Sequence, residues 1–336
     1  MFYVDNIIAV YHRHHLQEVD ELFSWIQSCY KLWNMGEASW FLGICILWDR
    51  SSRKLWLCQD SYIDKIVNHF HLSDRSPPAT PLASAQSIQS LNTEDVAGPQ
   101  HIYGYQQWIG SILYTTIITR PDIAFARSQL SCFLLNRGRK HVNTADQIIA
   151  YLTSTKHYAI EYGQHVNTSP SGEAFMCSSD AAFANNPDRK STEDYHCTLF
   201  DGSIDWRSGK QRTVTTSSTE TELLSLSEAA KQLAWWKRLF QAINFNPEHT
   251  LHLKCNNQQT IGLIMKEEPP LSTRLCHVDI HQHWLRQEAQ AKQAHINWVP
   301  TNSMTANGLT KALPGQRHET FVNMLGLWDI RPIIWA

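Results

Sequence analysis

The sequence has little charge and almost no imbalance of charge. Only 18% of its 336 residues are charged, and the formal net charge is −2. Proteins that bind nucleic acid through a whole face usually carry a basic excess, so nucleic-acid binding here would need a local basic patch. The eight cysteines include no CxxC pair. This pattern predicts reduced core thiols of an intracellular protein rather than a disulfide framework.

Long apolar runs and phosphate-binding glycine loops are missing too. The longest uncharged apolar run, near 109–118, is far shorter than the ~20 residues that a membrane helix needs. Asp5 interrupts the N-terminal residues, so we expect no signal peptide. These absences predict a protein of the cytoplasm or nucleus with no membrane partner.

The sequence does contain enough apolar residues for packed cores. Hydrophobic residues make up 43% of the chain, 13 of them Trp, and the length suggests two or three domains. Stretches rich in Ser, Pro, Ala, Thr and Asn interrupt the apolar pattern and are typical of linkers. The predicted division is 1–71, a linker 72–100, a helical region 101–162, a linker 163–172, a domain 173–313 and a C-terminal tail 314–336.

The stretch from 173 to 240 has the strongest pattern. An apolar strand carries Asp180 near its end, and a hairpin follows in which Asp201-Gly202 predicts a type I′ turn. A long helix then starts at a capping box, Ser217 to Glu220. Glu222 lies on the apolar face of this helix, in its first turn. A carboxylate there suits a cleft edge or a metal site, although it could also simply favour the helix dipole.

The remaining elements of this region alternate between strand and helix. We expect strands at 251–255 and 295–300, separated and followed by helices at 256–266, 278–293 and 303–312. Three antiparallel strands followed by this alternation are the order of a ribonuclease H-like α/β domain, with helices on both faces of a mixed sheet.

Further upstream, short hairpins and helices are expected. A hairpin turns at Asp5-Asn6, and another turns between 49 and 54. Amphipathic helices are predicted at 12–33 and 60–70. The region 101–162 reads as helical in two or three pieces, broken near 119–121 and 136–139.

Short motifs along the whole chain resemble those of one family. In order, they are Tyr3-Val4-Asp5-Asn6 (resembling YVDD), Trp40-Phe41-Leu42-Gly43-Ile44 (YFLGI), Thr80-Pro81-Leu82 (TPL), Thr119-Arg120-Pro121-Asp122-Ile123-Ala124 (TRPDIAYA), Ser179-Asp180-Ala181 (SDADWA), Arg189-Lys190-Ser191-Thr192 (RKSTSGY), Ser217-Ser218-Thr219-Glu220-Thr221-Glu222 (SSTEAEY) and Leu309-Thr310-Lys311 (LTK). The chain thereby resembles the C-terminal part of the Pol polyprotein of copia-type LTR retrotransposons. In that family the end of a reverse transcriptase, with palm, thumb and connection, precedes a ribonuclease H domain.

The resemblance implies two-metal catalysis with Mg²⁺ or Mn²⁺ held by carboxylates. Asp180 and Glu222 match two of the four ribonuclease H acids and are the implied metal ligands. Asn256 and Asn307 stand where the family has Asp. In the polymerase hairpin Asp5 is kept, but Asn6 replaces the second acid. The resemblance therefore implies a polymerase-inactive and ribonuclease-impaired copy. Asp205 or Asp279 could compensate, although nothing in their spacing argues for it.

Other residue patterns have a functional and a structural interpretation. Four basic residues could contact phosphates of an RNA–DNA hybrid or form a solvated edge: Arg189, Lys190, Lys210 and Arg212. His277 and His281, with Cys276 and His283 nearby, have a spacing that could hold zinc but also suit plain helix positions. Trp235-Trp236 could stack bases or belong to the core.

Three hypotheses for function follow. The first is a ribonuclease acting on RNA–DNA hybrids, alone or with the rest of a Pol polyprotein encoded upstream. The second is a binding module that keeps the nucleic-acid groove without hydrolysis. The third is a non-functional relic of a decayed element.

Overall fold

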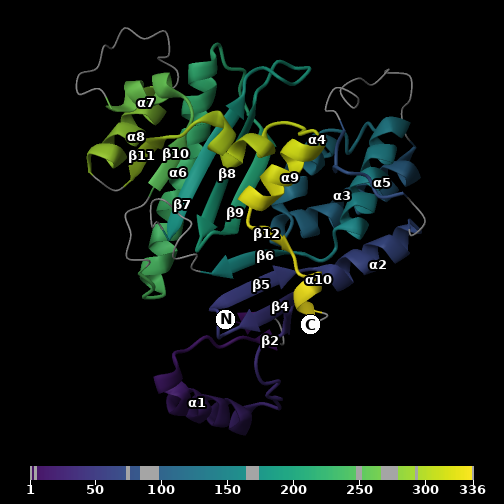
Figure 1. Ribbon diagram of the computed structural model, residues 1–336, viewed down its shortest axis with the longest axis vertical. Helices are drawn as coiled ribbons and strands as arrows, with labels where there is room; N and C mark the ends of the chain where they lie inside the picture. Colours follow the sequence, from purple (N-terminus) through teal and green to yellow (C-terminus); the bar gives the residue numbers. More distant parts are fainter. Residues whose placement is uncertain are drawn as a thin grey trace.

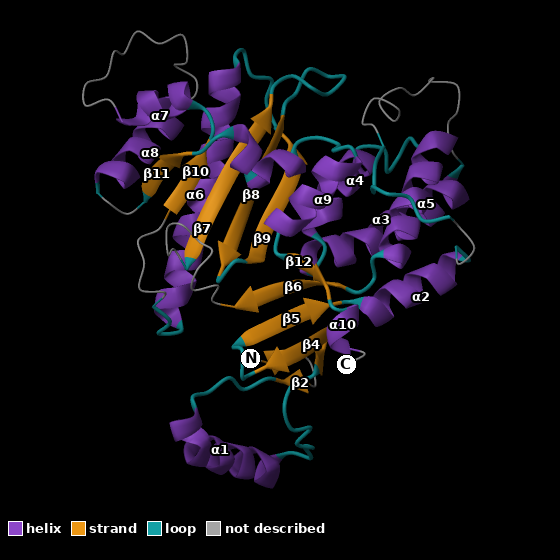
Figure 2. Ribbon diagram, viewed as in Figure 1, coloured by secondary structure: helices purple, strands orange, loops and turns teal. Residues whose placement is uncertain are grey.

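Two five-stranded sheets and their helices make up most of the protein (Figure 1). The computed structural model describes residues 2–3, 6–72, 76–83, 98–163, 174–246, 252–265, 279–291 and 294–334. In Figure 2 the strands of the first sheet run upward through the picture, and those of the second sheet lie across its lower half. The two sheets are joined side by side through β6 and β9, which contact each other.

The first sheet has the mixed topology expected of a ribonuclease H-like domain. Its order is β11-β10-β7-β8-β9. The strands β7, β8 and β9 are antiparallel to their neighbours in this series, and β10 and β11 are parallel to β7. The strands are β7 (Phe175–Ala182), β8 (Thr192–Leu199), β9 (Gly202–Lys210), β10 (His252–Cys255) and β11 (His295–Trp298). The predicted order of strands and helices is confirmed.

The long helix α6 (Ser218–Ala242) covers one face of this sheet, with α7 (Gln258–Met265) and α8 (Asp279–Gln290) beside it. The helix starts as predicted, because the Ser217 hydroxyl accepts a hydrogen bond from the Glu220 amide. Its apolar residues, among them Leu226 and Leu233, are buried in one core with β7, β8 and β10. Trp236 packs against this core, whereas Trp235 is 51% exposed.

The hairpin between β8 and β9 turns one residue earlier than predicted. Leu199 pairs with Gly202, and the positive φ values fall on Phe200 (50°) and Asp201 (65°) rather than on Asp201-Gly202. Gly202 is required for another reason. A Cβ atom there would lie 2.4 Å from the ring of Tyr162 on β6, so glycine permits the close approach of the two sheets.

The second sheet is antiparallel throughout, in the order β12-β6-β5-β4-β3. Its strands are β3 (Trp40–Phe41), β4 (Ile44–Asp49), β5 (Lys54–Cys58), β6 (Tyr158–Gly163) and β12 (Leu327–Asp329). The hairpin expected around 49–54 is confirmed. However, 158–163 forms a strand instead of continuing the helical region, because Ala159 and Ile160 are fully buried between β5 and β12.

The C-terminal segment, which we expected to be a tail, is built into the fold. It contains α9 (Gly315–Met324), β12 and α10 (Arg331–Ile334). Phe321, Leu325 and Leu327 are buried in one cluster with Ile160 and Leu309. This cluster lies between the two sheets, since Ile160 belongs to the second sheet and Leu309 to the 3-10 helix η6 (Thr305–Leu309), which contacts β7 and β8.

The helical region consists of α2 (Asp60–Phe70), α3 (Pro99–Ile118), α4 (Ala124–Ser131) and α5 (Arg139–Ser154). These helices share a hydrophobic core, and α4 contacts β9 of the first sheet. The predicted breaks near 119–121 and 136–139 are confirmed. Arg120, at the first break, is fully buried. It donates to Asp122 at 2.6 Å and lies between the rings of Tyr151 and Tyr158. This paired charge ties the helices to the sheet.

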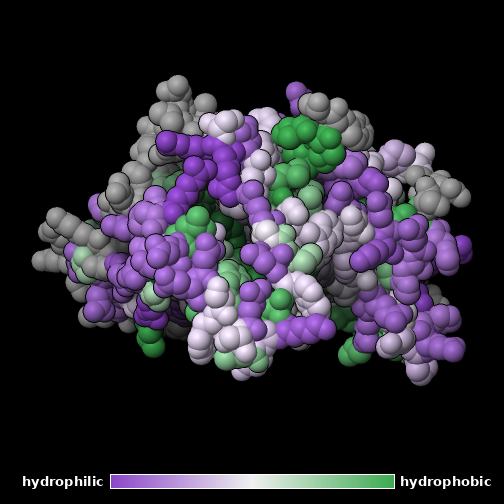
Figure 3. Space-filling view, turned by 90° about the horizontal axis from the view of Figure 1, so that it is seen from below, coloured by the Kyte–Doolittle hydropathy of each residue, from purple (hydrophilic) through white to green (hydrophobic). Residues whose placement is uncertain are grey.

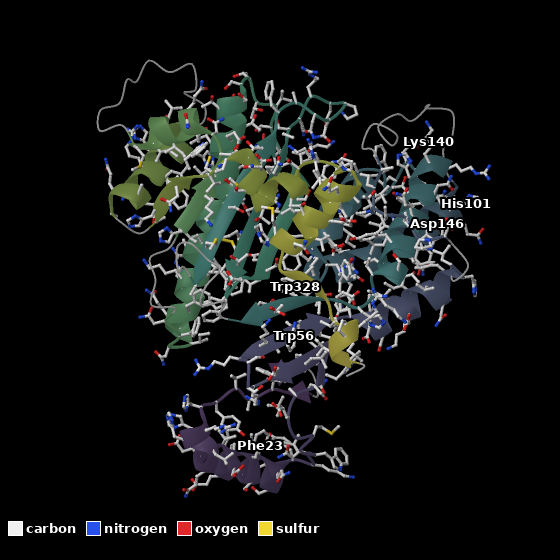
Figure 4. All side chains as sticks on the ribbon, in the orientation of Figure 1. Phe23, Trp56, His101, Lys140, Asp146 and Trp328 are labelled. Carbon is white, nitrogen blue, oxygen red and sulfur yellow. A yellow bond between two sulfur atoms is a disulfide. The ribbon has the colours of Figure 1, made fainter. Side chains whose placement is uncertain are left out.

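The N-terminal residues form a separate projection. β1 (Phe2–Tyr3) and β2 (Asn6–Ile7) form the expected hairpin. The helix α1 (Leu16–Cys29) has no buried residue, and its Phe23 lies away from the main body in Figure 4.

Seen from below in Figure 3, apolar side chains form separate patches among polar ones. None of the described helices has the length and apolar character needed to cross a bilayer.

The prediction of reduced thiols is wrong for two cysteines. Cys177 on β7 and Cys197 on β8 are directly opposite each other and form a disulfide, with their Cα atoms 4.0 Å apart. Five other cysteines are free: Cys29, Cys45, Cys58, Cys132 and Cys255. Cys276 lies outside the described residues. The sequence did not reveal the disulfide because the pairing depends on strand register, which the spacing of cysteines does not encode.

Candidate active site

Asp180 lies at the centre of the candidate site, near the end of β7. The side chain is buried, and both of its carboxylate oxygens accept hydrogen bonds. Asn256 Nδ2, just after β10, donates to Asp180 Oδ1 at 3.0 Å. Thr310 Oγ1, just after η6, donates to Asp180 Oδ2 at 2.9 Å. The structure therefore places a neutral amide donor against the first of the predicted acids.

Glu222 is the fifth residue of α6, just after the first turn rather than in it as predicted, and is also buried, with 8% of its surface exposed. Its Oε2 atom has no hydrogen-bond partner. Burial, and to a smaller extent the negative charge of Asp180, raises the pKa of Glu222 to about 9. Glu222 thus faces the site, as the sequence pattern predicted.

Asn307 belongs to the short helix η6, which brings the fourth predicted position to the same region. Its backbone carbonyl lies 3.2 Å from the Thr310 hydroxyl that donates to Asp180. All four predicted positions therefore meet around the end of β7. However, among the residues that the structure describes, no group of three or more His, Cys, Asp and Glu side chains could hold a metal ion.

A third buried acid, Asp194, was missed by the sequence reasoning. It lies on β8 directly opposite Asp180 and is 2% exposed. Its Oδ1 accepts a hydrogen bond from the Asp180 amide at 3.1 Å, while its Oδ2 has no partner. Burial, followed by the charge of Asp180, raises the pKa of Asp194 well above its usual range. The signal was present in the sequence, since Asp194 stands at the glycine of the RKSTSGY pattern.

The other acids considered from sequence have different surroundings. Asp205 lies on β9, where Trp236 Nε1 donates to it at 3.0 Å and the Tyr195 hydroxyl donates to it at 3.2 Å. It therefore supports the packing of α6 on the sheet. Asp279 is the first residue of α8. Among the described side chains, no hydrogen bond joins Asp205 to Asp180.

The four basic candidates lie at one edge of the first sheet, around the β7–β8 connection and the end of β9. Arg189 and Arg212 are exposed, and Lys190 and Lys210 are partly buried. Lys210 Nζ pairs with Asp188 at 3.2 Å. This edge is consistent both with phosphate contacts and with a solvated charged border.

Only part of the zinc and polymerase patterns falls on described residues. His281 Nδ1 lies 2.8 Å from the Ser227 hydroxyl, while Cys276 and His277 lie outside the described residues. Asn6 is the first residue of β2 and pairs with Tyr3, but Asp5 is also outside the described part of the chain. The structure therefore brings together the four positions that the resemblance assigns to the ribonuclease H site.

No protein-family model matches the sequence. The chain is 29% identical to the Pol polyprotein from transposon TNT 1-94 of Nicotiana tabacum, over 97% of this chain and 24% of that protein. It is 27% identical to the Pol polyprotein from transposon RE1 of Arabidopsis thaliana, over 88% of this chain and 19% of that protein. A foamy viral protease–reverse transcriptase solved with dsDNA aligns with a TM-score of 0.42 and 14% identity, over 86% of this chain and 52% of that chain.

The chain spans about a quarter of the length of the first of these polyproteins and about a fifth of the second. The two matches cover 97% and 88% of this chain's own residues. The chain belongs to the Pol polyproteins of copia-type LTR retrotransposons and corresponds to a segment of them.

Proposed function

We propose that residues 174–313 are the ribonuclease H-like module of a Pol polyprotein, and that hydrolysis of RNA in RNA–DNA hybrids is impaired in this copy. The hydrogen bond from Asn256 Nδ2 to Asp180 Oδ1 supports the impairment most directly. An amide that donates into a carboxylate occupies the oxygen that a metal ligand would have to offer, and it brings no negative charge of its own.

The metal pair of such enzymes supplies an activated water and stabilises the leaving oxygen. The residues present here do not fit that pair well. Both oxygens of Asp180 are already hydrogen-bonded, and two of the four positions carry amides. We therefore derive no catalytic step through Mg²⁺ or Mn²⁺ for this chain.

Restoring the two acids tests this proposal. The double change Asn256→Asp with Asn307→Asp removes the amide donor from Asp180 and adds two charges. We expect Mg²⁺-dependent cleavage of a labelled RNA–DNA hybrid to rise at least about tenfold above the unaltered chain, because changes around metal ligands typically alter affinity or activity 10–100-fold. Each single change should give less, since ligands of one site are not additive.

The matched control adds Asp180→Ala to the double variant, which should abolish the gain. Gel analysis of the cleaved hybrid is the measurement, and circular dichroism checks that each variant is folded. Efficient cleavage by the unaltered chain that survives Asp180→Ala would show that the site is assigned wrongly.

We also propose that this chain does not synthesise DNA by itself. Asn6 brings an amide to the hairpin position where the resemblance implies a second acid. Primer extension on an RNA template, with Mg²⁺ or Mn²⁺, should give no product above a control without protein. Extension that depends on Asp5, tested with Asp5→Asn, would contradict the proposal.

A binding module without hydrolysis is the second candidate, favoured by the exposed Arg189 and Arg212 at one sheet edge. Such a module should bind the uncleaved hybrid with an affinity that falls as salt rises. Fluorescence anisotropy with the double change Arg189→Ala and Arg212→Ala distinguishes specific use of this edge from general weak binding.

A further inference from the structure

Cys45 and Cys58 lie directly opposite each other on the antiparallel strands β4 and β5. Opposite residues in such a pair have Cα atoms about 4.5–5.5 Å apart, which falls within the range of about 4.4–6.8 Å that disulfides span. Both thiols are free in this structure, and each influences the pKa of the other. The strand pairing therefore already places the two cysteines at a separation that a disulfide can span.

The first sheet of the same molecule contains the oxidised form of this arrangement. Cys177 and Cys197 are also opposite residues on antiparallel neighbours, and they form a disulfide. The two cysteine pairs thus share one geometry and differ in oxidation state.

The two thiols of the free pair are not equivalent. Cys58 is 1% exposed and belongs to a small core with Trp56, Ala159 and Ile330. Cys45 is only partly buried, so a small molecule can reach it first. The interaction with Cys58 lowers the pKa of the Cys45 thiol, whereas the interaction with Cys45, followed by burial, raises the pKa of Cys58. Since the thiolate is the nucleophile, Cys45 is suited to attack and Cys58 to resolve.

We propose that Cys45 and Cys58 form a thiol–disulfide exchange site that reacts with small disulfides such as glutathione disulfide. The Cys45 thiolate attacks one sulfur of glutathione disulfide, and the S–S bond breaks to release one glutathione thiolate. Cys58, as it loses its proton, attacks the Cys45 sulfur of the mixed disulfide and releases the second glutathione thiolate. The two cysteine protons end on the two glutathione thiolates, so the dithiol is oxidised by two electrons and glutathione disulfide is reduced to two thiols.

The test incubates the full chain with glutathione disulfide and follows each cysteine by peptide mass spectrometry. The unaltered chain should yield a linked peptide pair, Cys45 to Cys58, with little mixed disulfide. Cys58→Ser should instead accumulate glutathione on Cys45, because the resolving thiol is gone. Cys45→Ser should leave Cys58 unmodified. Cys29 and Cys132, which are exposed, serve as internal controls and should form mixed disulfides only.

Cys45 should react about tenfold faster than Cys132 if the neighbouring thiol activates it. Time-resolved trapping of the unaltered chain measures this ratio and needs no variant to fold. Mixed disulfides at Cys29 and Cys132 without a Cys45–Cys58 link would overturn the proposal, as would equal glutathione capture at Cys45 and Cys58 in the two single variants.

Discussion

At the scale of single residues, the candidate site has lost two negative charges and gained one, relative to the family motifs that it resembles. Two positions where the resemblance implies Asp carry amides, Asn256 and Asn307, while Asp194 adds an acid where the motif has glycine. Asp194 Oδ2 has no hydrogen-bond partner, and burial, followed by repulsion from the charge of Asp180, raises the pKa of Asp194. A buried acid of this kind weakens the folded state unless it keeps its proton.

The sign of the pH effect follows from the raised pKa of Asp194. The folded state holds the proton more tightly than the unfolded state, so the free energy of unfolding falls as pH rises above the unfolded pKa. Asp194→Asn removes this loss. We expect it to stabilise the protein by about 1–3 kcal/mol at pH 8, and by less at pH 4. Urea unfolding at both pH values, with a chelator present, measures the difference.

Asp205→Asn is the matched control. Both oxygens of Asp205 accept hydrogen bonds, from Trp236 and Tyr195, so an amide there would turn its NH₂ group toward a donor. This variant should destabilise the protein by about 1–2 kcal/mol. If Asp194→Asn destabilises it equally at pH 8, Asp194 contributes a favourable contact and the argument from its unpartnered oxygen fails.

At the scale of elements, the segment after residue 313 joins structures that are distant in sequence. Helix α9 and strand β12 place Phe321, Leu325 and Leu327 in one buried cluster with Ile160 and Leu309. Gly308 on η6 lies against the Phe321 ring, because a Cβ atom there would come within 2.3 Å of it. Since η6 also carries Asn307, packing of α9 holds one side of the candidate site in place.

Phe321→Ala should therefore destabilise the whole protein. Truncation of a buried aromatic residue typically costs about 3–5 kcal/mol, and we expect a loss in that range by denaturant unfolding. Trp328→Ala is a suitable comparison because Trp328, on the neighbouring β12, is 48% exposed. Figure 4 shows it on the same sheet as the buried Trp56. Equal losses for both variants would mean that the cluster does not stabilise the fold as described.

At the scale of the whole molecule, local patterns predicted the elements better than their long-range pairing. The capping box at Ser217 and the apolar face of α6 were readable because each depends on residues within a few turns. The strand β6, the role of 315–334 and the Cys177–Cys197 disulfide were not, because each depends on partners more than a few residues away. Asp180 and Glu222 were predicted from a motif, whereas the partners of their oxygens required coordinates.

The pairing of β6 with β12 has a consequence for synthesis on the ribosome. One edge of β6 pairs with β5, which is made earlier, but its other edge pairs with residues 327–329, made more than 160 residues later. The first sheet uses only residues 175–298 and can assemble while that edge is still open. An open strand edge is a site for wrong pairing. This edge of β6 therefore stays unpaired until residues 327–329 have been made.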